Sequence, residues 1–124
     1  MLRQGIVPPF AHGLLEYGAA VLLLAGPFVF GFDSSAATAV SIMAGLGVLV
    51  LTATTASSTG LTKVIPLALH PLLDLALVAV VIASPFVFGY SDETAPTAFL
   101  MVFGVWHLLL TIATRFGPRA ETTP

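Results

Sequence analysis

Four apolar stretches, separated by short polar breaks, constrain this chain more than any other feature of its sequence. They run from about Phe10 to Phe30, Ala37 to Ala56, Ile65 to Phe88 and Thr97 to Phe116. Each is close to the ~20 residues that a helix needs to cross a hydrocarbon layer of ~30 Å. Because lipid offers no hydrogen-bond partner to the backbone, we predict that all four stretches are helices.

The composition supports membrane residence. Only 8% of the residues are charged and the mean hydropathy is +1.04, whereas soluble domains carry about 25% charged residues. Ten charged side chains cannot cover the surface of a soluble protein of this size. The net charge of −2 gives no indication of a nucleic-acid partner, and the absence of cysteine excludes disulfides and thiolate metal sites.

Two nearly identical heptapeptides lie 58 residues apart, GPFVFGF at 26–32 and SPFVFGY at 84–90. The same shift, without a gap, aligns further residues: His12 with His70, Glu16 with Asp74, and Met43 with Met101. Two tandem helical hairpins explain this repeat, and both enter the membrane in the same sense because each has an even number of spans. The predicted fold is therefore an all-α membrane protein with four transmembrane helices arranged as two tandem, parallel-repeat hairpins.

We predict one membrane domain over residues 1–124, with hairpins at 10–57 and 65–116 and a disordered tail at 117–124. In this arrangement all basic residues fall on one side of the membrane: Arg3, Lys63, Arg115 and Arg119. The positive-inside rule then predicts that both termini are cytoplasmic and that the heptapeptides lie near the outer face.

The heptapeptides resemble the motif of the SPW-repeat family, small bacterial and archaeal membrane proteins with a Ser-Pro-Trp motif in the first of two helices per repeat. The residues that carry the resemblance are Gly26, Pro27, Phe28 and Gly31 in the first copy, and Ser84, Pro85, Phe86 and Gly89 in the second. Both copies have phenylalanine in place of the motif tryptophan, and the first has glycine in place of serine. The resemblance implies the four-span fold and the plasma membrane of a prokaryote, but no particular activity.

Proline within a helix removes one backbone hydrogen bond, so we expect a kink or a helix end at Pro27 and Pro85. The Ser84 hydroxyl can bond back to an earlier carbonyl and compensate for the lost bond, whereas Gly26 cannot. We interpret the heptapeptides as structural corners with aromatic anchoring, rather than as broken helices that frame a transport site.

Two histidine–carboxylate pairs interrupt the apolar stretches. Each carboxylate follows its histidine by four residues, His12 with Glu16 and His70 with Asp74, so each pair shares one face of a helix. An intramembrane carboxylate costs about 2.5–3.5 kcal/mol on insertion scales, so both need compensation. The repeat predicts that the two pairs lie at equal depth and converge near the pseudo-two-fold axis.

Three interpretations of the pairs remain open. They can form a polar clamp between helices, a proton or cation site, or a His–carboxylate metal site, and the sequence favours them in that order. His107, in the fourth stretch, has no histidine counterpart and is a candidate extension of the polar site. We predict no catalytic residue, no metal and no cofactor.

Phosphate-binding loops, nucleophile elbows and HExxH motifs are absent from the sequence. The predicted function is therefore that of an integral membrane protein of unknown specific role, a non-enzymatic accessory or oligomerising subunit. The alternative is proton or cation transport through the His/carboxylate site. Expected partners are the lipid bilayer and further membrane subunits or copies of this chain, but not nucleic acid.

Overall fold

The computed structural model describes residues 6–57 and 59–114 of the chain. Its elements are α1 (Pro9–Val29), α2 (Ser35–Thr54), the 3₁₀ turn η2 (Leu67–Leu69), α3 (His70–Val87) and α4 (Thr94–Ala113). With η2 joined to α3, the described part contains four helices of 20 or 21 residues that are apolar enough to span a membrane. The predicted all-α, four-span fold is confirmed. The predicted tail and the three arginines lie outside the described residues.

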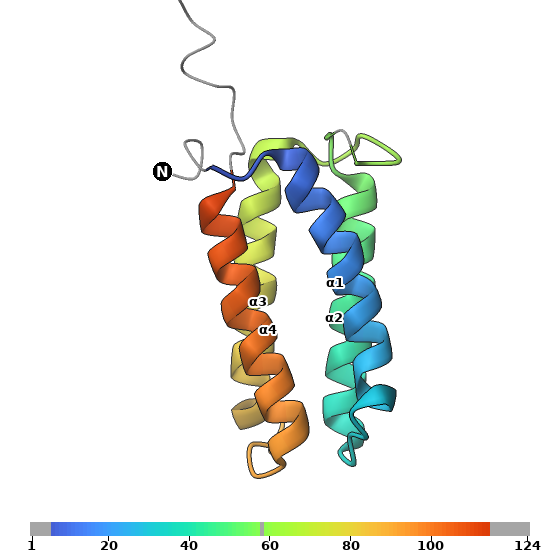
Figure 1. Cartoon of the computed structure of the whole chain (residues 1–124), viewed down its shortest axis with the longest axis vertical. Helices are drawn as coiled ribbons and strands as arrows, with labels where there is room; N and C mark the ends of the chain where they lie inside the picture. The colour runs from blue at the N-terminus through green and yellow to red at the C-terminus, as the bar shows by residue number, and fades with distance from the viewer. Residues whose placement is uncertain (1–5, 58, 115–124) are drawn as a thin grey trace, which may run out of the picture.

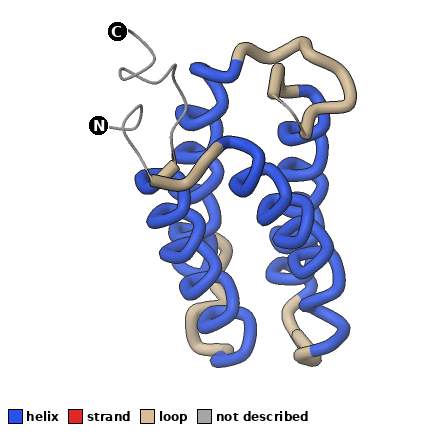
Figure 2. Tube along the Cα trace, turned by 45° about the horizontal axis from the view of Figure 1, so that its top comes forward, coloured by secondary structure: helices blue, strands red, loops and turns tan. Residues whose placement is uncertain are grey.

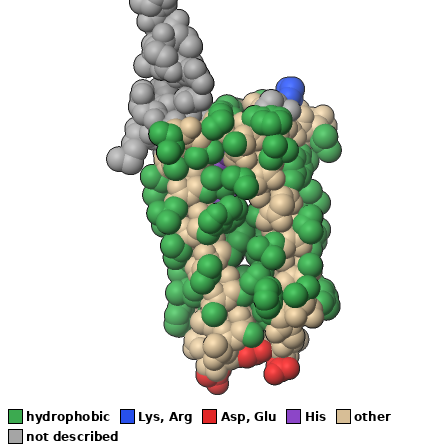
Figure 3. All heavy atoms as spheres, viewed as in Figure 1, with side chains coloured by type: hydrophobic (Ala, Val, Ile, Leu, Met, Phe, Trp, Pro, Cys, Tyr) green, Lys and Arg blue, Asp and Glu red, His purple; other side chains and the backbone are tan. Residues whose placement is uncertain are grey.

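The helices form two hairpins that stand side by side, α1 with α2 and α3 with α4 (Figure 1). Loops gather at the two ends of the bundle (Figure 2). The starts of α1 and α3 and the link between the hairpins share one end, and the two hairpin turns share the other. Lys63, the single lysine or arginine of the described residues, lies in the link at the first end, and acidic side chains gather at the turns (Figure 3).

The repeat holds with one correction, because it needs a gap. The first spans begin 58 residues apart, at Pro9 and Leu67, but α2 and α4 begin 59 residues apart, at Ser35 and Thr94. The second hairpin turn is thus one residue longer than the first. The fourth helix also begins earlier than predicted and includes Pro96 in its first turn, where a backbone N–H has no intrahelical partner to lose.

The heptapeptides end the first helix of each hairpin. Both helices continue two residues past the proline, and a glycine then takes a positive φ, 64° at Gly31 and 76° at Gly89. The N–H groups of Phe32 and Tyr90 bond back to the carbonyls of Pro27 and Pro85, at 2.9 Å each. This is the Schellman type of helix end, in which the left-handed residue is usually glycine.

Each proline leaves the carbonyl four residues earlier without its helical donor, and a serine supplies the missing bond. Ser84 donates to the carbonyl of Val81 within α3, at 2.7 Å, as its sequence position predicts. In the first hairpin, where Gly26 has no hydroxyl, Ser41 of α2 donates to the carbonyl of Leu23 at 2.6 Å. In both copies a serine thus bonds the carbonyl that the proline leaves free, but it comes from the same helix in the second copy and from the neighbouring helix in the first.

The two hairpins are joined at both ends of the bundle. At one end, short parallel bridges pair Val7 with Thr114 and Thr55 with Ile65, so the segment before each first helix meets the end of a second helix. At the turns, the Glu93 carboxylate accepts the backbone N–H groups of Asp33 and Ser34 at 2.6 and 2.9 Å. Between these two ends lies a buried apolar core. The polar side chains described next are buried between this core and the end that carries the parallel bridges.

Candidate functional site

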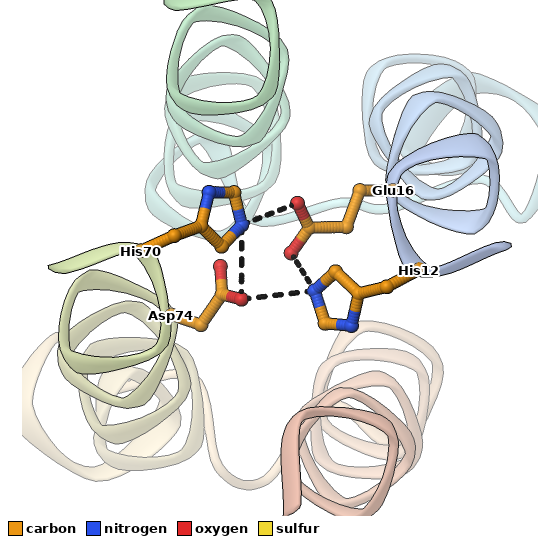
Figure 4. A group of neighbouring side chains, drawn as sticks. All are labelled: His12, Glu16, His70 and Asp74. Atoms are coloured by element: carbon orange, nitrogen blue, oxygen red, sulfur yellow. Dashed lines mark hydrogen bonds and ion pairs between the residues drawn. The ribbon is translucent and has the colours of Figure 1, made fainter. Parts of the chain in front are cut away.

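Four ionisable side chains from α1 and α3 meet between the two hairpins (Figure 4). His12 Nε2 lies 2.8 Å from Glu16 Oε2 and 3.0 Å from Asp74 Oδ2. His70 Nε2 lies 2.8 Å from Glu16 Oε1 and 3.1 Å from Asp74 Oδ2. Histidines and carboxylates therefore alternate around a closed ring, in which each imidazole contacts the carboxylate of its own helix and that of the other. We call these four residues the polar ring.

The polar ring lies inside the bundle and not at its surface. Its four side chains have exposed fractions of 4% or less, and both carboxylates are fully buried. Glu16 follows the start of α1 by seven residues, which places it about 10 Å along the helix. The ring is thus within the membrane-spanning part of the bundle, nearer the end at which both hairpins begin.

Glu16 is held by two further side chains. Thr52 of α2 donates to its Oε1 at 2.7 Å, and His107 of α4 contacts its Oε2 through Nε2, also at 2.7 Å. All four helices therefore contribute to the site. Asp74 is held less closely, because its Oδ1 has no hydrogen-bond partner within the described part of the chain and lies 3.6 Å from His107 Nε2.

Two threonines fix the proton positions of the ring histidines. The hydroxyls of Thr55 and Thr114 each donate to a backbone carbonyl four residues earlier, at 2.6 Å. A hydroxyl has one proton, so the same oxygens can only accept from the histidines that they contact at 2.7 Å, His70 Nδ1 and His12 Nδ1. Both Nδ1 atoms therefore carry a proton, and each threonine comes from the hairpin opposite to that of its histidine.

This proton assignment determines what charge the ring requires. A neutral imidazole with its proton on Nδ1 has a lone pair on Nε2, and in the ring that lone pair points at carboxylate oxygens about 3 Å away. The contacts of His12 and His70 become attractive only when positive charge lies between nitrogen and oxygen. Two protons, or one divalent cation, would make them attractive and would also neutralise the two carboxylates.

The ring departs from the two-fold symmetry of the repeat at Asp74. In the 59-residue register, Thr111 is the counterpart of Thr52, the donor to Glu16. Aspartate is one methylene shorter than glutamate, and the expected bond from Thr111 to Asp74 is not formed. Both Asp74 Oδ1 and Thr111 Oγ1 are buried without a hydrogen-bond partner in residues 6–57 and 59–114, as is His107 Nδ1. The two carboxylates of the repeat thus differ, because Glu16 accepts a hydrogen bond from a threonine and Asp74 Oδ1 accepts none within the described residues.

The structure brings together all four residues of the predicted pairs and also His107. The structural counterpart of His107 is the core residue Val48, rather than Leu49 as the gapless register implied. The heptapeptide residues lie at the opposite ends of α1 and α3, away from the ring. The sequence interpretation missed the threonines, whose signal was a second repeat: Thr52-x-x-Thr55 recurs 59 residues later as Thr111-x-x-Thr114.

Four apolar spans around a buried polar site define the chain as a multi-pass membrane protein. The model of the SPW repeat domain family matches residues 10–114, a range that includes both hairpins and every residue of the site. The chain therefore belongs to the SPW repeat domain family, as the heptapeptides indicated. No curated protein and no solved structure matches the chain.

Proposed function

We propose that this protein is a non-enzymatic membrane protein that binds positive charge, as two protons or one divalent cation, in the polar ring. The observation that carries the proposal is the orientation of His12 and His70, whose Nε2 atoms face carboxylate oxygens while their Nδ1 protons are engaged by threonines. A ring without added positive charge would combine lone-pair repulsion with two uncompensated carboxylates, each of which costs about 2.5–3.5 kcal/mol in a membrane.

The space around the ring favours an ion or a water molecule over an organic substrate. The cavity beside His12 and His70 has a volume of only 10 Å³, about the space that one water molecule requires. Its lining includes Thr52, Thr55 and Thr59, and it extends toward the link between α2 and η2. Binding of a small cation fits this space, and a reaction on a larger molecule does not.

Binding also fits the bundle better than conduction. Beyond the ring, toward the hairpin turns, the buried core contains Leu23, Val81, Leu100 and Phe103. These side chains offer no hydrogen bonds to a proton or a metal ion on its way across the membrane. By the positive-inside rule we further propose that the ring end of the bundle and both termini face the cytoplasm of a prokaryotic cell.

A charge-compensation cycle tests the proposal. His12→Gln alone and Asp74→Asn alone each leave an unbalanced buried charge, and breaking a buried ion pair costs about 3–5 kcal/mol. The double variant removes one partner of each sign. We expect its loss in free energy of unfolding to be smaller than the sum of the two single losses by about 1–3 kcal/mol, the range of coupling between residues in contact. The measurement is reversible unfolding of purified protein in detergent that contains a chelator.

The matched control pairs His12→Gln with Glu93→Gln, which lies in the turn at the far end of the bundle. Those two effects should add, because distant residues without shared partners do not couple. Additive effects in the ring pair as well would contradict the proposal.

A second candidate function, that of an accessory or oligomerising subunit, is favoured by the outer surface. A groove of 790 Å³ lies between α1 and α4, and its lining is apolar, with small residues such as Gly18, Ala95 and Ala98 beside Phe99 and Trp106. Small residues allow a further helix to approach closely in a membrane. The two functions are compatible, because the ring is buried between the hairpins and the groove faces outward.

A further inference from the structure

We propose that the polar ring is a binding site for one divalent transition-metal ion of the zinc class. The ligands are Nε2 of His12, Nε2 of His70 and one carboxylate oxygen each from Glu16 and Asp74. This inference rests on the proposed binding of positive charge and names the ion. It goes beyond the interpretation from sequence, which placed a metal site last among three.

The four ligand atoms are already close to the geometry that such an ion requires. One ligand atom from each residue can be chosen so that all four lie within 4.8 Å of one another. Each imidazole Nε2 is 2.8–3.1 Å from an oxygen of both carboxylates, and Glu16 offers Oε2 to His12 and Oε1 to His70. Zinc bonds of ~2.0–2.1 Å in a tetrahedron separate neighbouring ligands by about 3.3 Å. Around an ion, neighbouring nitrogens and oxygens would therefore move apart by a few tenths of an ångström, and the more distant ligand pairs, which are up to 4.8 Å apart, would move closer.

The surroundings of the ring have the outer hydrogen bonds that metal-binding histidines use. Such histidines donate their other ring N–H to an acceptor, which fixes the tautomer and aims the lone pair at the metal. The Nδ1 protons of His12 and His70 are held in this way by Thr114 and Thr55. The same threonines are anchored to their own helices by bonds of 2.6 Å, so the imidazoles cannot rotate freely.

The two carboxylates of the ring differ in how many hydrogen bonds hold them. Thr52 and His107 each bond to an oxygen of Glu16 and thereby hold that carboxylate in place. Asp74 Oδ1 is fully buried and has no hydrogen-bond partner among the described residues. A buried carboxylate with an unpaired oxygen is costly, and a cation bound at its other oxygen would offset part of that cost by neutralising its charge.

The donor set selects the class of metal. Imidazole nitrogen with carboxylate oxygen suits zinc, iron and similar ions, whereas calcium prefers six to eight oxygens and magnesium keeps several waters. The tight cavity beside the ring leaves no room for such hydration. A divalent ion with two neutral imidazoles and two carboxylates is electrically neutral, so the occupied site carries no net charge into the membrane.

Metal binding by purified protein tests the inference. After treatment with a chelator, the protein is equilibrated with ZnCl₂ or CoCl₂, and bound metal is measured by elemental analysis and by the visible absorption of Co²⁺. We expect about one ion per chain, the tetrahedral type of cobalt spectrum, and a melting temperature that rises with metal concentration. Asp74→Asn should abolish the cobalt spectrum.

Thr55→Val is the sharper variant, because it leaves all four ligands in place and removes only the acceptor for His70 Nδ1–H. Loss of such an outer bond typically weakens metal affinity 10- to 100-fold. Thr54→Val is the matched control, because the Thr54 hydroxyl bonds the Val50 carbonyl at 2.7 Å but does not contact the ring. It should bind metal as the unmodified protein does.

Two results would overturn the inference. The first is folded, unmodified protein that takes up neither Zn²⁺ nor Co²⁺. The second is uptake that Thr55→Val and Asp74→Asn leave unchanged, which would place the metal elsewhere. If metal is not bound but the charge-compensation cycle still shows coupling, the ring holds protons and the proposed function stands. If neither is observed, both proposals fail.

Discussion

Glu16 and Asp74 are equivalent in the sequence repeat, but the structure predicts that they contribute unequally to stability. The comparison is between Glu16→Gln and Asp74→Asn, which each replace one carboxylate by the amide of the same size. Glu16 takes four contacts of 2.7–2.8 Å, from the three histidines and Thr52. Asp74 takes two, at 3.0 and 3.1 Å, and its other oxygen is unpaired within the described residues.

The difference is therefore two short hydrogen bonds. Hydrogen bonds between membrane helices average about 0.6 kcal/mol, and bonds to a charged group in proteins contribute about 1.5–3 kcal/mol. Glu16→Gln should then reduce the free energy of unfolding by at least about 1 kcal/mol more than Asp74→Asn. The difference in unfolding free energy reaches about 3 kcal/mol or more if each of the two bonds contributes as much as a hydrogen bond to a charged group usually does. The amide introduced by Glu16→Gln adds to the difference, because its NH₂ group replaces an oxygen that accepted hydrogen bonds and cannot accept them itself.

Unfolding of both variants in the same detergent, with a chelator present, measures the difference directly. Equal destabilisation, or a larger effect of Asp74→Asn, would refute the asymmetry inferred from the hydrogen bonds. Glu16→Asp provides a further check, because it shortens this side chain to the length found at position 74. It should lose the bond from Thr52 while it keeps the charge.

Two further predictions concern the orientation and the outer surface. The chain has no native cysteine, so Lys63→Cys should react with an impermeant thiol reagent only from the cytoplasmic side, and Asp92→Cys only from the outer side; the reverse pattern would contradict the proposed orientation. Gly18→Leu should weaken self-association in mild detergent, measured by light scattering, because it fills the groove; an ideal Cβ at Gly18 meets no atom within 4 Å, so the fold should be unaffected. A protein that is monomeric with and without the substitution would argue against the oligomerising function.

The sequence by itself determined the membrane fold and the pairing of the ionisable residues. Stretches of about 20 apolar residues have one stable form in lipid, because only a helix satisfies its backbone there. The repeat of His12-x-x-x-Glu16 as His70-x-x-x-Asp74 then required equal depth in the two hairpins. Local geometry and the cost of buried charge were enough for both conclusions.

Other features of the fold could have been predicted only in part. The serine that replaces the hydrogen bond lost at Pro85 is the preceding residue, Ser84, and sequence reasoning identified it. The serine that compensates Pro27 is Ser41, on another helix, and no local rule points to it. The extra residue in the second hairpin turn was concealed because Met43 and Met101 aligned without a gap.

Only the tertiary structure decided how the ring works. The protons of His12 and His70 are fixed by Thr114 and Thr55, each from the opposite hairpin, so the required positive charge follows from contacts between residues 102 and 15 positions apart. The difference between Glu16 and Asp74 likewise depends on other helices, because Thr52 and His107 bond to Glu16 and no group of the described residues bonds to Asp74 Oδ1. Chain composition and periodicity fix what must be buried, but distances of a few tenths of an ångström between packed helices determine which buried groups meet.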